Sequence, residues 1–144
     1  MEVRSKVYTY HTSVKWTEQR KGVISSAGKP DIQVATPPEF KGHDGIWSPE
    51  DLFVASANTC VLTTFLAMAE RAGLAFTSYE SVAEGRLELV DGKFQVTTIT
   101  LKPTITLAAS TDAAKAKELI EKAEANCLIS NSMKARVSVE PTIR

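Results

Sequence analysis

The sequence predicts an α+β domain in which mostly antiparallel sheets pack on one long central helix. Three features support this prediction: a long uncharged helical stretch near the middle, two strand-like runs joined by Asp91-Gly92, and an amphipathic helical segment before a final strand. Strands and helices that are grouped rather than alternating are typical of α+β folds. With 144 residues and no linker or repeat, the chain is expected to form a single domain over residues 1–144.

The central helix is predicted to run from Ser48 to Gly73. Ser48 can cap its free amides, Pro49 suits the first helical position, and Gly73 supplies the stop. No charged residue occurs between Leu52 and Ala69, so the helix needs cover on nearly every side, from the rest of the chain or from a second copy. Its serine, asparagine and threonine residues favour a buried helix of a soluble protein over a membrane span.

The segment before this helix is predicted to be rich in strands. A strand of imperfect alternation is expected over residues 3–16, and a turn over residues 17–22. Two short strands should follow, over residues 23–26 and 32–35. Residues 37–44 are expected to form a loop because their prolines and glycine suit no regular element.

The segment after Gly73 is predicted to begin with a long hairpin. Its strands should cover residues 79–90 and 93–107, since Asp91-Gly92 between them is a strong two-residue turn signal. A change in the apolar phase predicts a bulge near Thr97 and Thr98. Pro103 predicts an edge position or the end of pairing, because proline has no amide to donate.

The last third of the chain is predicted to form a second helix and a short strand. The helix should start at Ser110 or Thr111 and end near Asn126, and the strand should cover residues 134–141. One helical face carries apolar residues at helical spacing: Ala116, Ile120, Ala123 and Cys127. Cys127 therefore stands at the end of an inward-facing stripe.

The composition excludes some classes of partner. Seventeen basic residues balance seventeen acidic ones, so nothing favours attraction to nucleic acid or to an anionic membrane. The N-terminus lacks the apolar core of a secretion signal, and a cytoplasmic protein is expected. In that compartment two cysteines do not form a structural framework, so any pairing between them should be transient and chemical.

The two cysteines allow two interpretations. Each can be a small core residue, which is the usual role of a lone cysteine on an apolar helix. A reactive role requires stabilisation of the thiolate, and Cys60 lies too far along its helix for the helix dipole to supply it. A cation would then have to come from elsewhere. Of the two, Cys60 is the better attacking thiol and Cys127 the better resolving one, since Cys127 follows a helix C-terminus.

Metal and cofactor chemistry find no support in the sequence. His11 and His43 are the two histidines, and neither lies at ligand spacing from a cysteine. No glycine-rich phosphate loop, Ser-His-Asp arrangement or other cofactor signature occurs. We therefore expect no metal and no cofactor.

Several motifs together resemble the OsmC/Ohr family of thiol-dependent hydroperoxide reductases. They are the run Ser-Pro-Glu-Asp-Leu-Phe from Ser48 to Phe53, then Cys60, and finally a downstream helix that ends at Cys127. The resemblance extends over essentially the whole chain and includes the turn at Arg20. It implies an OsmC-like fold and an intertwined homodimer with sites at the interface.

The resemblance also implies a role for four residues. Cys60 matches the peroxidatic cysteine, and Cys127 the resolving cysteine that condenses with its sulfenic acid. Arg20 matches the arginine that favours the thiolate and orients the peroxide, and Glu50 the carboxylate that holds this guanidinium. A planar cation suits this task because it can face a thiolate and a peroxide oxygen together while a carboxylate grips it with two hydrogen bonds.

Helix geometry adds an argument for a dimer. Glu50 and Cys60 are ten residues apart on one helix, so their backbones are about 15 Å apart, beyond the combined reach of the two side chains. The simplest solution brings Glu50 of one chain toward Cys60 of a second chain. Phe40, Trp47 and Phe53 could line an apolar entry for an organic peroxide, with ordinary core packing as the alternative.

The sequence departs from the family pattern at two places. Leu128 follows Cys127 where the family typically has proline, and Thr59 and Val61 flank Cys60 where Ala-Cys-Phe is usual. These departures indicate a divergent member. The expected function is reduction of organic hydroperoxides, with a dithiol or lipoyl protein as reductant. The alternatives are a non-catalytic dimer that binds a small apolar or thiol ligand in its cleft, and a purely structural module.

Overall fold

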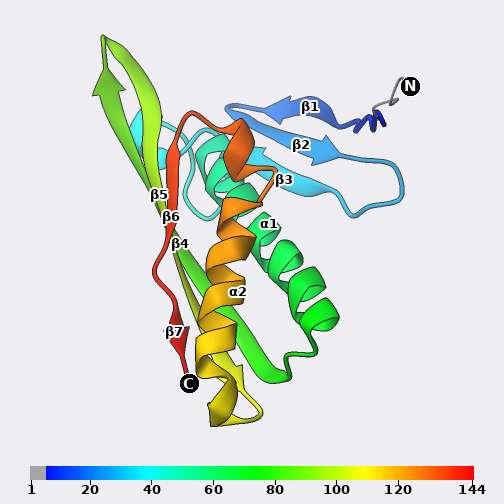
Figure 1. Ribbon diagram of the computed structural model, residues 1–144. Coiled ribbons are helices and arrows are strands. Elements are labelled where there is room, and N and C mark those ends of the chain that lie inside the picture. Colours follow the sequence, from blue (N-terminus) through cyan, green and yellow to red (C-terminus); the bar gives the residue numbers. More distant parts are fainter. Residues whose placement is uncertain (1–5) are drawn as a thin grey trace, which may run out of the picture. The chain divides into compact units, whose positions relative to one another are not determined.

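The computed structural model describes residues 6–144, which form two compact units. The N-terminal unit comprises residues 6–52 and the C-terminal unit Phe53–Arg144. Both contain sheets, and helix α1 (Pro49–Ala72) begins in the first and continues in the second (Figure 1). The predicted α+β class is confirmed.

The N-terminal unit is built on a three-stranded antiparallel sheet in the order β1-β2-β3. Its strands are β1 (Ser13–Glu18), β2 (Lys21–Ser25) and β3 (Ile32–Ala35). The first strand was predicted to begin too early, since residues 6–12 form no strand. Strand β2 ends at Ser25, which pairs with Ser13, so the residues before Ser13 have no strand opposite them. Residues 3–5 of that prediction lie outside the described residues. The loop before α1 contains a short 3-10 turn, η1 (Pro38–Phe40).

One face of this sheet is apolar and open. Val14 lies opposite Ile24, and Trp16 opposite Gly22, so all four share a face. Ile32 continues that face on β3 as the partner of Ile24. Val14 is 73% exposed and Trp16 is 72% exposed, so the chain itself provides little cover for this face.

Helix α1 begins and ends where the sequence predicts. The Asp51 amide donates to the Ser48 hydroxyl and the Ser48 amide to the Asp51 carboxylate, both at 3.0 Å, which is a reciprocal N-terminal cap. Gly73 follows with a φ of 67°, a left-handed conformation that favours glycine and ends the helix.

A single chain covers α1 on one side. The buried positions are four residues apart and form one stripe: Ala57, Val61, Phe65 and Ala69. Phe53 and Leu66 are exposed, so the expectation of cover on nearly every side is not met within one chain. By length and composition alone α1 could cross a membrane, a property that core helices of soluble proteins share.

The C-terminal unit contains a sheet in the order β4-β5-β6. Strands β4 (Phe76–Val90) and β5 (Lys93–Leu107) form the predicted hairpin, and Asp91 and Gly92 at its turn have φ values of 50° and 78°. Strands β6 (Arg136–Val139) and β7 (Thr142–Ile143) pair with β5 in parallel. The sequence did not predict β7 or this parallel pairing.

Strand β5 has two irregularities, and both occur at positions that the sequence predicts. The register of the hairpin shifts where Arg86 pairs with Thr98 and Leu87 pairs with Val96. Thr97 is therefore the extra residue of the predicted bulge. On the other side of β5, pairing with β6 ends at Leu101 and pairing with β7 starts at Thr104. Pro103 falls in this gap, where its missing amide costs no hydrogen bond.

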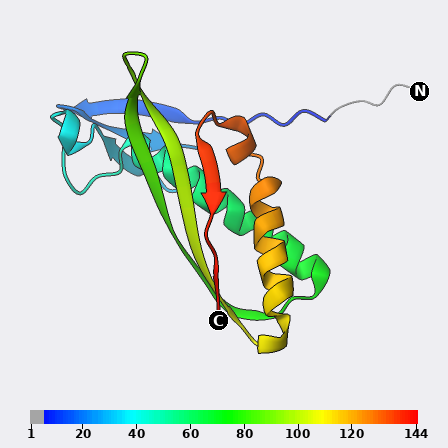
Figure 2. The same cartoon turned by 60° about the vertical axis from the view of Figure 1, so that its left-hand side comes forward.

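The helices of the C-terminal unit lie on the same face of its sheet (Figures 1 and 2). Helix α2 (Ala113–Ala125) follows the 3-10 turn η2 (Ser110–Asp112), and a third such turn, η3 (Ser130–Ser132), follows α2. The predicted stripe on α2 is confirmed, since its members are fully buried: Ala116, Ile120, Ala123 and Cys127. They pack with the stripe of α1 in one core.

Candidate dithiol site

Cys60 lies near the middle of α1, next to the buried stripe. It is half-buried, because Val61 beside it points into the core while Thr59 faces solvent. Its sulfur is 4.0 Å from the Thr64 hydroxyl, one turn further along the helix. The helix therefore presents a thiol at the edge of the core, where it is partly accessible.

Cys127 lies two residues after the end of α2 and is fully buried. The chain turns tightly around it: the Asn131 amide donates to the Cys127 carbonyl at 3.0 Å, and the Ser130 amide donates to the Cys127 sulfur at 3.4 Å. The inward stripe of α2 and this turn together fix the thiol in position.

The structure brings the two cysteines together. They come from different helices of the C-terminal unit, and they lie close enough for each to shift the pKa of the other. Both are reduced. The sequence placed Cys127 at the end of an inward-facing stripe, and the packing of α1 and α2 in one core explains why the two thiols meet.

The environments of the two thiols shift their pKa values in opposite directions. For Cys60, partial burial acts to raise the pKa, but hydrogen bonds from Cys127, from the Ile129 and Leu128 backbone and from Thr64 together lower it. For Cys127, burial raises the pKa, and the neighbouring Cys60 raises it further. Cys60 is therefore the thiol that ionises first, and Cys127 is the thiol that keeps its proton.

The sequence indicated only part of this stabilisation. It led us to expect that a cation must come from elsewhere to stabilise a thiolate at Cys60, and that contribution stays a prediction. Within residues 53–144 the groups that lower the pKa of Cys60 are a thiol, a hydroxyl and two backbone amides. Sequence reasoning missed the amides of Leu128 and Ile129, because the direction of a backbone N–H depends on how the turn after Cys127 folds.

Arg20 lies in the N-terminal unit, at the turn between β1 and β2. Its Nη1 donates to the Phe40 carbonyl at 2.9 Å, which draws the guanidinium toward η1. A hollow of about 420 Å³ lies beside it, lined by Val14, Trp16 and Pro49 among others. The Trp16 ring is held by a hydrogen bond from its Nε1 to the Gln19 carbonyl at 2.9 Å.

Glu50 lies in the first turn of α1 and is half-buried. Its Oε1 is buried and has no hydrogen-bond partner among the described residues. Within residues 6–52 no ion pair joins Glu50 to Arg20. A pairing of these two residues between chains stays a prediction.

The aromatic residues predicted to line an entry are dispersed within their units. Trp47 is 51% exposed and lines an open hollow with Gly45 and Ile46. Phe40 is half-buried beside Arg20, and Phe53 is partly exposed on α1. The hollow beside Arg20 is lined instead by Val14 and Trp16 among others, for which the sequence suggested no functional role.

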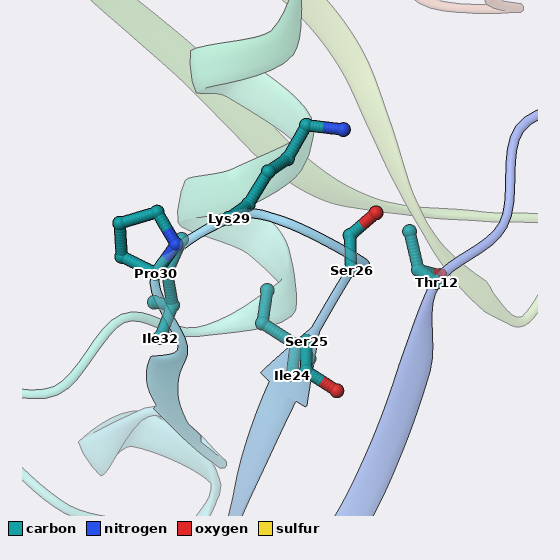
Figure 3. Close-up of a pocket in the computed structure, with 7 residues that line it drawn as sticks. All are labelled: Thr12, Ile24, Ser25, Ser26, Lys29, Pro30 and Ile32. Carbon is teal, nitrogen blue, oxygen red and sulfur yellow. The ribbon is translucent and has the colours of Figure 1, made fainter.

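A second hollow, of about 360 Å³, lies at the other end of the same sheet (Figure 3). Its lining comes from strands β2 and β3, the loop between them and Thr12, and it includes Ile24 and Ile32. These two isoleucines belong to the open apolar face. The two hollows thus lie along one largely apolar surface of the N-terminal unit.

The described residues include no group of three or more histidine, cysteine, aspartate or glutamate side chains that could hold a metal ion. What the C-terminal unit presents is a pair of neighbouring free thiols between two helices packed on one sheet, one thiol half-buried and the other fully buried. This arrangement defines a dithiol protein of α+β fold.

Comparison with known proteins specifies the family. The family model described as "OsmC: OsmC-like protein" matches residues 42–142, and the chain therefore belongs to the OsmC family. It is 32% identical over 101 residues to "Peroxiredoxin OsmC" of Escherichia coli strain K12, covering 70% of this chain and 69% of that protein. It is also 29% identical over 136 residues to "Uncharacterized protein YmaD" of Bacillus subtilis strain 168, covering 91% and 90% of the two chains.

A solved structure supports the fold independently. An OsmC-like protein of unknown function from Vibrio cholerae superposes with a TM-score of 0.86 at 22% identity, covering 94% of this chain and 99% of that one. The predicted family and the predicted fold are both confirmed.

Proposed function

We propose that the chain is a thiol-dependent peroxidase that reduces organic hydroperoxides with Cys60 and Cys127. The observation that carries this proposal is the packing of two free thiols in one core, with the pKa of Cys60 lowered and that of Cys127 raised. A peroxidase needs one thiolate that attacks and one thiol that resolves. The E. coli relative, whose name includes peroxiredoxin, supports the same chemistry.

In the first step the Cys60 thiolate attacks the outer oxygen of the hydroperoxide. The O–O bond breaks, the alcohol leaves after taking up a proton, and Cys60 is oxidised to a sulfenic acid. In the second step the Cys127 sulfur attacks the Cys60 sulfur. A disulfide forms and water leaves with the proton of Cys127. An external dithiol, such as a lipoyl protein, must then supply two electrons and two protons to restore both thiols.

We further propose that the active form is a homodimer in the cytoplasm. The open apolar face of the N-terminal unit and the exposed Phe53 and Leu66 of α1 support a second copy as cover. In this arrangement Arg20 orients the peroxide, and Glu50 of one chain grips the guanidinium near Cys60 of the other. The buried Glu50 Oε1 without a partner among the described residues is consistent with a partner from outside the chain.

The test is a thiol count before and after exposure to cumene hydroperoxide. The reduced protein should consume the peroxide and lose the mass of two hydrogens. Cys60→Ser should reduce consumption to background, whereas Cys127→Ser should allow one oxidation and then accumulate sulfinic acid at Cys60.

Two results would count against the proposal. Intact thiols after excess peroxide would refute it, and together with thermal stabilisation by an apolar or thiol compound they would favour the ligand-binding alternative. Equal activity of the two serine variants would reverse or remove the assigned roles.

A further inference from the structure

Two threonines that follow Cys60 on α1 use their hydroxyls differently. The Thr63 hydroxyl donates to the Cys60 carbonyl at 3.0 Å, a local bond that threonine side chains commonly form within helices. The Thr64 hydroxyl instead lies 4.0 Å from the Cys60 sulfur, one helical turn away. Because residues four apart share a helix face, the helix itself holds this hydroxyl next to the thiol.

The contact between Thr64 and the sulfur favours the ionised form of Cys60. A neutral thiol and a hydroxyl can each donate to the other, whereas a thiolate can only accept. Loss of the sulfur proton therefore leaves the Thr64 hydroxyl as the donor of this pair, and hydrogen bonds to an ionised partner are stronger than neutral ones. Burial raises the pKa of Cys60, and this hydrogen bond is among those that together lower it.

The other groups around the sulfur leave room for such a role. Among residues 53–144, the titratable group that acts on Cys60 is Cys127, from the segment after α2, and no charged side chain is among the groups that shift the Cys60 pKa. The ion pairs of that range join other side chains. Thr64 is half-buried whereas Thr63 is exposed, so water competes less for the hydroxyl that faces the sulfur.

We propose that Thr64 is a further functional residue of the dithiol site, whose hydroxyl donates to the Cys60 thiolate and stabilises it before attack. Helical spacing alone predicts that the two residues share a face, but only the structure shows that the Thr64 hydroxyl meets the sulfur while the Thr63 hydroxyl takes the carbonyl. Only the consequence for peroxide reduction rests on the proposed function. The hydrogen bond can be tested without peroxide.

The experiment compares Thr64→Val with wild type in the full-length reduced protein. Valine keeps the shape of threonine and removes the hydroxyl. The rate at which iodoacetamide alkylates Cys60 is followed from pH 5 to pH 10, with mass spectrometry of the Cys60 peptide as the site-resolved readout. Thr64→Val should react about two- to tenfold more slowly near neutral pH, the effect of one lost hydrogen bond. Its profile should shift to higher pH, and the two rates should converge once both thiols are ionised, whereas blocked access would keep the variant slow.

Two further variants separate the hydroxyl from its surroundings. Thr64→Ser keeps the donor and should restore the wild-type profile, and Thr63→Val removes the neighbouring hydroxyl and should also match wild type. Circular dichroism checks that each variant is folded, and Thr64→Ala is the donor-free chain to use if Thr64→Val does not fold.

An unchanged profile in a folded donor-free variant would overturn the proposal. An equal shift in Thr63→Val or in Thr64→Ser would do the same, because the effect would then not depend on the Thr64 hydroxyl. Since no peroxide is present, a failure here is distinguishable from a failure of peroxidase activity.

Discussion

The two units differ in how far one chain completes them. In the C-terminal unit, Phe65 and Ile120 are fully buried, and the thiol pair is assembled between two helices. In the N-terminal unit, Val14 and Trp16 are more than 70% exposed on the face that carries the hollow beside Arg20. The difference teaches that one chain alone brings the two thiols together, whereas the sheet next to Arg20 keeps an apolar face exposed.

The largest effect should come from the core of the C-terminal unit. Phe65 is fully buried and its ring lies 5.5 Å from that of Phe76 and 5.4 Å from that of Tyr79. Phe65→Ala should lower the free energy of unfolding by about 3–5 kcal/mol, because it opens a cavity that its neighbours cannot fill. Urea denaturation measures this change. Thr59→Ala on the same helix is the control, since Thr59 is exposed and lies outside the surface proposed to meet a second copy. An equal loss there would contradict the comparison.

An intermediate effect is expected at the open face of the N-terminal unit. Trp16→Ser should raise the dimer dissociation constant by about tenfold or more, because exposed tryptophans that become buried at an interface dominate its energy. Analytical ultracentrifugation over a dilution series measures this constant. Lys15→Ser, on the opposite face of β1, should leave it nearly unchanged. A wild-type chain that is monomeric at micromolar concentration would remove the basis of this prediction.

The smallest effect concerns the helix that continues from one unit into the other. Ser48→Ala removes the hydroxyl that accepts from the Asp51 amide and should cost about 1 kcal/mol of unfolding free energy. Ser56→Ala is the control, because the Ser56 hydroxyl bonds only to the Phe53 carbonyl within the same helix. Thermal and urea unfolding compare the two. Equal losses would show that the cap contributes nothing specific.

Local signals in the sequence sufficed for much of the fold. The cap at Ser48, the stop at Gly73 and the Asp91-Gly92 turn act on residues next to them, so their consequences can be read directly. The inward position of Cys127 followed from helical spacing alone.

Features that depend on distant residues could not be predicted in this way. Strand β7 has two residues and exists because β5 offers unpaired groups beyond Pro103. The early start predicted for the first strand failed because its partner ends at Ser25. Cys60 and Cys127 meet only because the two helices pack in one core, and no local pattern reports that contact.

The bulge at Thr97 determines how far the hydrophobic side of the β4–β5 hairpin extends toward its tip. Side chains alternate along a regular strand, so Val96 and Ile99, three residues apart, would face opposite sides. Because Thr97 is left unpaired in the bulge, they face the same side, which Leu87 and Leu89 on the neighbouring strand share. The hydrophobic surface of the sheet therefore extends toward the hairpin tip, where the Leu89 side chain is 65% exposed. If Thr97 were paired in a regular strand and not bulged, Thr97, Gln95 and Lys93 would stand on the side of Ile99, and the tip would show water a wettable end on that side.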